Sequence, residues 1–150
     1  MKITSPAFGN NQSIPRQYTC DGENINPPLE FLEVPVGTKS LVLIMEDPDV
    51  PKYIREDGRW DHWLIWNIPP ETKNITENST PPGLVGLNTS GRTDYVSPCP
   101  PDREHRYFFK LYALKTTLDL PAGSTKADLL AVMQAHIIDQ AELIGLYQRI

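Results

Sequence analysis

Two aspartates follow a predicted buried strand in this chain and offer carboxylates at its end. The apolar run 41–45 predicts the strand, and Asp47 and Asp49 come almost directly after it. Because Asp47 precedes a proline, its backbone should stay extended, and we expect both carboxylates on one side of the chain. Paired acids at a rigid strand end suit a binding or acid–base site. A turn that only ends the strand explains the same residues, since Asp and Pro are common in turns.

Two histidines lie near the starts of two further predicted strands. His62 belongs to the aromatic and apolar segment 60–69, and His105 begins the segment 105–114. Strand alternation places His105 and Tyr107 on one face of the second segment, with apolar side chains following them. Polar groups are therefore expected at the end of an apolar face.

A proline-rich loop, 95–101, comes shortly before the second of these strands. Its three prolines fix the backbone, and its few remaining amides could point into a cleft. Imidazoles, a phenol and such amides can donate hydrogen bonds to phosphate oxygens. Carboxylates would repel a dianion, so they fit better as acceptors for a histidine or for the amine of a head group. The sequence therefore suggests a site for a small phosphate-containing or zwitterionic ligand, such as phosphoethanolamine.

A metal-dependent or acid–base hydrolase is the alternative interpretation of the same residues. Two histidines with one or two aspartates can form a metal triad that activates water. The chain has no HExxH motif, no GxSxG motif and no Walker or Rossmann glycine pattern. Cys99 lies between prolines with no evident base, although His105 could lie near it in space. Acid–base chemistry by an Asp–His pair stays open, but we predict a protein that is not an enzyme and uses no cofactor or metal.

The order of these segments resembles the phosphatidylethanolamine-binding protein family, and more closely its bacterial and archaeal branch, the Raf kinase inhibitor-like proteins. The resemblance covers nearly the whole chain. Its motifs are Tyr-Thr-Cys-Asp-Gly at 18–22, Pro-Pro-Leu at 27–29, Asp-Pro-Asp at 47–49 with Pro51, His-Trp at 62–63, and Cys-Pro-Pro at 99–101 with His-Arg-Tyr at 105–107. Ser97 departs from the family's usual glycine and fills space that glycine would leave open to a ligand. The segment 31–33 is also unusual for the family.

The resemblance implies a small anion pocket and the residues that form it. We expect these to be Asp47, Asp49, Pro51, Trp60, His62, Cys99, Pro100, Pro101, His105 and Tyr107, although Trp60 could equally be a core aromatic. The resemblance also implies a regulator or inhibitor of partner proteins such as kinases or proteases. Self-association as a homodimer is a further implication.

Composition agrees with one domain, residues 1–150, that needs no disulfide or metal ion to fold. The chain has 150 residues, of which 39% are hydrophobic, enough for a core of its own. A formal net charge of -5 without a run of basic residues argues against nucleic acid and against anionic membranes as partners. The first residues lack the apolar region of a signal peptide, and no apolar run is long enough to span a membrane. We therefore expect a cytoplasmic protein.

The cytoplasmic expectation decides how the two cysteines are interpreted. Cys20 and Cys99 lack CxxC spacing, and a reducing cytosol makes a structural disulfide uncommon. We expect two free thiols. Because both cysteines lie in loops that carry the family resemblance, an oxidising compartment or a thermophilic source would favour a bridge between them.

The elements that must position these residues are short strands separated by prolines. The chain has 15 prolines in 150 residues, which excludes long helices over most of its length. The segment 70–91 reads as an extended loop, and Thr125 should cap one helix of about ten residues. The segment 137–147 favours a final strand, because its β-branched residues and Gly145 disfavour a helix. We predict an antiparallel, Greek-key β-sandwich of two sheets with one or two short peripheral helices.

Overall fold

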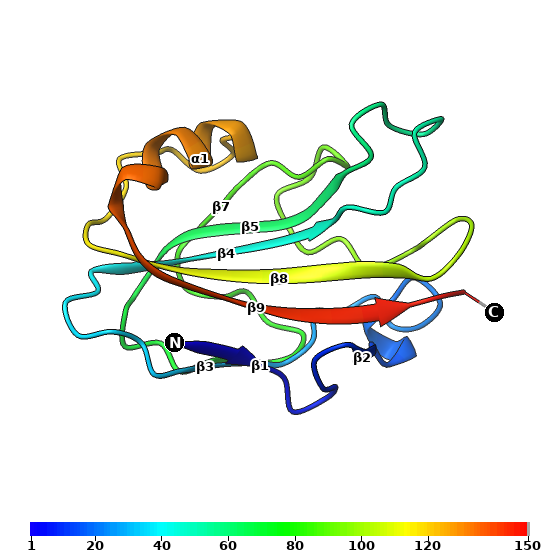
Figure 1. Ribbon diagram of the computed structural model, residues 1–150, viewed down its shortest axis with the longest axis horizontal. Coiled ribbons are helices and arrows are strands. Elements are labelled where there is room, and N and C mark those ends of the chain that lie inside the picture. Colours follow the sequence, from blue (N-terminus) through cyan, green and yellow to red (C-terminus); the bar gives the residue numbers. More distant parts are fainter. Residues whose placement is uncertain (150) are drawn as a thin grey trace.

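The chain forms two β-sheets that pack face to face. In the computed structural model, which describes residues 1–149, the larger sheet has the strand order β2-β9-β8-β4-β5-β7 and the smaller has the order β1-β3-β6. Figure 1 shows the smaller sheet below β8 and β9, and α1 above β4 and β5. The strands are β1 (Lys2–Thr4), β2 (Gln12–Ser13), β3 (Leu29–Leu32), β4 (Ser40–Asp47), β5 (Trp60–Ile68), β6 (Asn74–Ile75), β7 (Leu84–Val85), β8 (His105–Leu114) and β9 (Ile137–Tyr147). The helices are α1 (Lys126–Met133) and the 3-10 turns η1 (Arg16–Tyr18) and η2 (Gln134–His136).

Strand pairing confirms the predicted fold class. Within residues 1–149, every strand pair is antiparallel except β2 with β9. The chain is mainly β, with one short α-helix at the periphery. The three long predicted strands are present as β4, β5 and β8, and the predicted final strand is β9.

The strand β4 lies at the centre of the larger sheet and is buried along its whole length. Leu41, Leu43 and Met45 face the core between the two sheets. Val42 and Ile44 face the other way, into a second cluster beneath α1. A strand covered on both faces has an uninterrupted apolar sequence, which is the pattern that predicted it.

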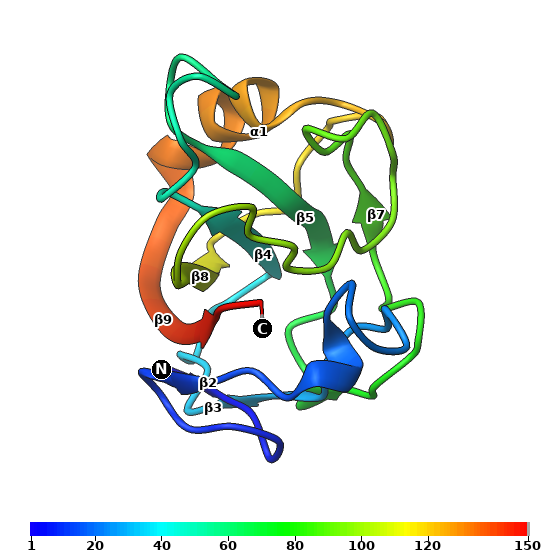
Figure 2. The same ribbon diagram turned by 90° about the vertical axis from the view of Figure 1, so that its right-hand side faces the viewer.

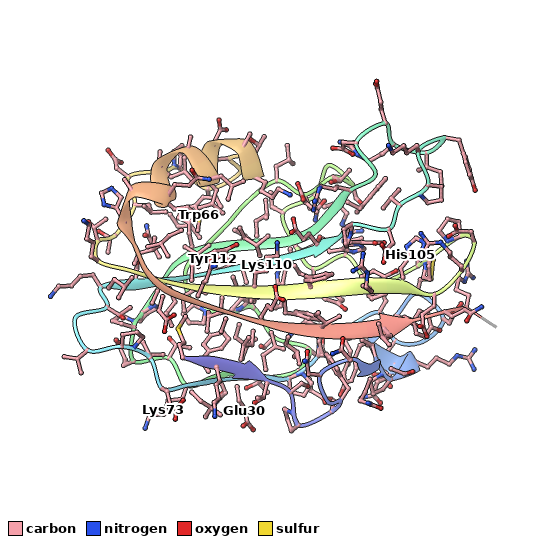
Figure 3. All side chains as sticks on the ribbon, in the orientation of Figure 1. Glu30, Trp66, Lys73, His105, Lys110 and Tyr112 are labelled. Atoms are coloured by element: carbon pink, nitrogen blue, oxygen red, sulfur yellow. A yellow bond between two sulfur atoms is a disulfide. The ribbon has the colours of Figure 1, made fainter. Side chains whose placement is uncertain are left out.

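The helix α1 covers part of the outer face of the larger sheet. Thr125 caps it, accepting a hydrogen bond from the amide of Asp128, whose side chain accepts from the Thr125 amide in return. Leu129 and Met133 of the helix belong to the same buried cluster as Trp66 of β5. Figure 3 shows Trp66 beneath the helix. The predicted helix start is confirmed, although the α-helix is somewhat shorter than expected and continues as η2.

The segment 70–91 contains two short strands in addition to the predicted loop. β6 extends the smaller sheet, and β7 forms the far edge of the larger sheet. The segment therefore crosses from one sheet to the other. Each strand has only two residues, too few to give a period-two pattern in the sequence.

The antiparallel arrangement brings the end of β4 and the starts of β5 and β8 to one end of the molecule. Asp47 pairs with Trp60 across β4 and β5, and Glu46 pairs with Phe108 across β4 and β8. Figure 2 looks onto this end of the molecule. The polar residues predicted at these three strand ends are consequently neighbours in space.

The capping box supplies a test of the helix boundary. Replacing Thr125 with Ala removes the acceptor for the Asp128 amide and should lower the free energy of unfolding by about 1 kcal/mol. Thr117→Ala is the matched control, because Thr117 is exposed and its hydroxyl makes no hydrogen bond within residues 1–149. Urea denaturation followed by circular dichroism measures both. Equal stability losses would contradict a capping role for Thr125.

Candidate functional site

A cavity of about 290 Å³ opens at the end of the sandwich where β4 ends and β5 and β8 begin. Eight of the ten predicted site residues line it: Asp47, Trp60, His62, Cys99, Pro100, Pro101, His105 and Tyr107. Sequence reasoning missed five further lining residues, which are Val50, Ile54, Ser90, Val96 and Ser97. Val96 and Ser97 belong to the proline-rich loop 95–101, although Ser97 was noted only as a departure from the family pattern. The other three lie in irregular loops without a pattern that could have indicated them.

Asp47 and His105 form a buried hydrogen-bonded pair at the bottom of the site. Nδ1 of His105 lies 2.6 Å from Oδ2 of Asp47, and its Nε2 lies 2.6 Å from Oδ1 of Asp102. Figure 3 labels His105 at the site end of β8. A neutral imidazole has a single N–H, so it can donate to one carboxyl group and accept from the other only if that group is protonated, whereas a protonated ring donates to both. Both ring nitrogens are thus engaged by the protein, and neither is available to a ligand.

The two carboxyl groups beside His105 differ in their protonation energetics. Burial raises the pKa of the Asp47 carboxyl, although hydrogen bonds from His105 and from the Asp49 amide act in the opposite direction. Desolvation also opposes ionisation of Asp102, but the hydrogen bond with His105 prevails and lowers its pKa. Sequence reasoning missed Asp102, which lies three residues before His105 in the loop that leads to β8. Its position makes it the outer support of the His105 ring.

Asp49 and Pro51 do not line the cavity, and the expectation that both aspartates lie on one side is wrong. Asp49 binds Arg106 in bidentate fashion, with Oδ1 2.8 Å from Nη2 and Oδ2 2.9 Å from Nε. Strand alternation ends at Asp47, because its Oδ1 accepts the Asp49 amide at 2.7 Å and turns the chain. The Arg106 guanidinium holds the pKa of the Asp49 carboxyl below its usual value. Asp49 therefore anchors the loop after β4 from outside the cavity.

His62 is held in one tautomer by a backbone carbonyl. Its Nδ1 lies 2.7 Å from the oxygen of Val96, and because a carbonyl only accepts, Nδ1 carries the proton. Burial lowers the pKa of His62 from 6.5 to about 4, with the Val96 carbonyl opposing and His105 reinforcing that shift. The ring is therefore neutral at pH 7, and its Nε2 carries a lone pair.

The hydroxyl of Ser97 has no protein partner within residues 1–149, and neither do two polar atoms of ring side chains at the cavity. They are Nε2 of His62 and Oη of Tyr107, whose rings meet edge-on with centroids 5.4 Å apart. Among the described residues, the one fully enclosed side-chain nitrogen or oxygen without a partner is Nδ1 of His136. The unpartnered atoms of His62 and Tyr107 must then reach open space, which is the cavity that both residues line.

Comparison with known proteins decides the family. Residues 4–148 match the family model described as phosphatidylethanolamine-binding protein. The chain belongs to the phosphatidylethanolamine-binding protein family. It is 48% identical to a UPF0098 protein of Chlamydia pneumoniae over 99% of both chains, and 48% identical to one of Methanothermobacter thermautotrophicus over 99% of both.

Solved structures of the phosphatidylethanolamine-binding protein family share the whole fold. A homologue from Chlamydia trachomatis superimposes with a TM-score of 0.97 at 48% identity, covering 99% of this chain and 97% of that one. YbcL of E. coli, described as a new member of the mammalian family, gives 0.88 at 28% identity, covering 99% and 98%. The resemblance that the sequence motifs indicated is therefore confirmed.

A disulfide joins Cys20 to Cys99 in this family member, so the prediction of two free thiols is wrong. The bond closes a loop with a sequence separation of 79 and ties the segment after η1 to the cavity wall. The Cys20 amide also donates to the Pro98 carbonyl at 3.1 Å, and Tyr95 Oη donates to the Tyr18 carbonyl at 2.9 Å. The sequence placed both cysteines in family motifs, but spacing alone could not show that their loops meet.

The Asp–His pair of the acid–base alternative is present, as Asp47 and His105. Residues 1–149 contain no group of three His, Cys, Asp or Glu side chains arranged to hold a metal ion. No lysine or arginine of those residues lines the cavity. The described helices are all too short or too polar to cross a membrane.

The tautomer of His62 is open to direct measurement. We expect ¹⁵N-detected imidazole spectra at pH 7 to show a neutral His62 ring with the proton on Nδ1. Because burial lowers its pKa, the ring should stay neutral down to about pH 5, whereas an exposed histidine titrates near pH 6.5. A His62 ring that is protonated at pH 7, or that carries its proton on Nε2, would contradict the geometry.

The disulfide gives a stability prediction. A Cys20→Ser, Cys99→Ser double variant should lose about 2–5 kcal/mol of unfolding free energy, because the bridge restricts a long loop in the unfolded chain. Reduction of the wild type should reproduce this loss, and reductant should leave the double variant unaffected. Guanidinium denaturation measures all four samples. Equal stability of oxidised wild type and double variant would show that the bridge does not form.

Proposed function

We propose that this protein binds a small phosphate-containing or zwitterionic ligand in the cavity and carries out no catalysis on it. Family membership supports a ligand-binding role. The cavity has room for a phosphate group with a short substituent, given its volume of about 290 Å³. It is also preformed, because a disulfide and three prolines hold one wall.

The observation that carries the proposal is the pair of unpartnered polar atoms, Nε2 of His62 and Oη of Tyr107. Both residues are almost completely buried, with 5% and 1% of their surface exposed. A ligand can engage both atoms, because the Tyr107 hydroxyl can donate to a ligand oxygen and Nε2 of His62 can accept from a ligand O–H or N–H. The walls around these atoms are mostly apolar, so a bound phosphate group would find few competing contacts.

Asp47 and His105 support the site from behind in this proposal. Their hydrogen bonds are satisfied by each other, by Asp102 and by the Asp49 amide. They fix the start of β8 and thereby the position of Tyr107 two residues on. The Asp47 and Asp102 carboxyl groups beside the His105 ring favour the ammonium of a zwitterion over a second anionic group.

A regulatory role would follow if the ligand were a phosphorylated side chain of a partner protein, such as a kinase or a protease. The loop after β4 presents Tyr53, 82% exposed, and Ile54, 43% exposed, beside the cavity that Ile54 lines. Such side chains could contact the protein surface around a phosphorylated residue.

Homodimer formation and a cytoplasmic location stay predictions. The disulfide implies an oxidising compartment or a thermophilic source.

A matched pair of tyrosine variants tests the proposal. Tyr107→Phe should weaken phosphoethanolamine binding about 2- to 13-fold, because it removes one neutral hydrogen bond of about 0.5–1.5 kcal/mol. Tyr112→Phe is the control, since Tyr112 packs on the opposite face of β8 beneath α1. NMR titration of backbone amides measures both affinities and locates the ligand. Saturable shifts away from residues 96–107, or none at all, would overturn the proposal.

A further inference from the structure

The hydrogen-bonding inventory of the cavity limits the protonation state of its ligand. His105 has no free nitrogen, because Asp47 and Asp102 occupy both. The indole N–H of Trp60 is directed at Ser90, 3.2 Å away. Prolines 100 and 101 have no N–H to offer. The uncommitted side-chain donors at the cavity within residues 1–149 therefore include the hydroxyls of Tyr107 and Ser97, beside the His62 lone pair.

The lone pair on Nε2 of His62 is available to a ligand bound in the cavity. Nδ1 donates to the Val96 carbonyl, so Nε2 is an acceptor as long as the ring is neutral. An unprotonated phosphate oxygen is also an acceptor, and two lone pairs repel each other. A phosphate that carries one proton can instead donate its O–H to Nε2. The same hydrogen bond forms if the ring takes the proton and the phosphate gives it up.

The groups around the His62 ring oppose a positive charge on the ring in the empty site. Tyr107 and His105 face it from β8, and Asp47 lines the cavity from β4. Burial removes water from the imidazole and disfavours its charged form, and the neighbouring His105 acts in the same direction. Asp61, next to His62 in β5, instead pairs with Lys126 on the outer face. The Asp47 carboxylate is already engaged by His105, so it gives His62 little compensation.

We propose that His62 makes the site selective for a phosphate monoester that brings one proton with it, so that ligand and protein share a proton between a phosphate oxygen and Nε2. This inference rests on the proposed function and adds that the bound complex contains one proton more than the ester dianion and the neutral His62 ring. Phosphate monoesters lose their second proton at a pKa of about 6, so the singly protonated form is available near neutrality. Sulfate monoesters have no such proton. The site thereby distinguishes two tetrahedral anions of similar shape by one hydrogen.

The proton balance gives the pH dependence its sign. At pH above about 6, the free ester is a dianion and free His62 is neutral, so the complex contains one proton more than its separated parts. Affinity for the phosphate ester should therefore fall about tenfold per pH unit above that value. Below it the affinity should level off, because the free ester already carries the proton.

Isothermal titration calorimetry of the whole chain with phosphoethanolamine and with its sulfate counterpart, O-sulfoethanolamine, tests the inference. In buffers of different ionisation enthalpy at pH 7.5, the phosphate ester should bind with uptake of about one proton. The sulfate ester should bind at least about tenfold more weakly, because it requires a protonated His62 ring. Phosphate-ester binding without proton uptake, or equal affinities, would overturn the inference while leaving the proposed function intact. No binding of phosphoethanolamine between pH 5.5 and 8 would overturn both.

Two histidine variants assign the effect to one residue. In His62→Gln the side-chain amide can donate without an added proton, so the pH dependence and the preference for phosphate over sulfate should both largely disappear. His136→Gln is the matched control, because His136 directly precedes Ile137, which pairs with Leu114 at the far end of β8 from His105. Retention of the full wild-type pH dependence in folded His62→Gln would assign the proton to another group and contradict the inference.

Discussion

The pairing of β4 with β5 on one side and with β8 on the other is the constraint from which the rest of the structure follows. The residues of β4 are all buried, so one row of its apolar side chains must enter the core between the sheets and the other must be covered by α1. Both neighbours run antiparallel to it. The end of β4 therefore meets two strand starts, and Asp47, His62 and His105 come together without any of them being adjacent in sequence.

The sequence predicted features that are local to a strand, but not those that depend on how distant segments meet. The run 41–45 predicted β4 because continuous burial leaves an apolar record in the sequence, and alternation placed Tyr107 on the inner face of β8. Alternation failed for Asp49, because the chain turns as soon as the strand ends at Asp47. The same rule was valid inside a strand and invalid two residues beyond it.

Family resemblance carried most of the site, and it was least informative about contacts between loops. Cys20 and Cys99 each lie in a segment that the motifs identified, yet the bond between them depends on how two irregular loops meet. Asp102 is a similar case, since its role comes from reaching Nε2 of His105 across a bend. Periodicity assigns faces only within regular elements, so loop partners have to come from coordinates.

The polar groups on the two faces of the larger sheet differ in whether they have hydrogen-bond partners, and this difference distinguishes the cavity. On the outer face, Glu46 binds Lys110 and Lys126, and Lys126 also binds Asp61 at 2.7 Å. Burial opposes ionisation of Glu46, but the two lysines prevail and lower its pKa. That network satisfies its own charges. On the inner face, the charged groups are likewise paired, but the neutral Nε2 of His62 and the hydroxyls of Tyr107 and Ser97 have no partner within residues 1–149. A charged group attracts any counterion, whereas a neutral group requires a matching hydrogen-bond donor or acceptor. Ligand recognition in this cavity is therefore expected to depend on which ligand oxygen carries a proton.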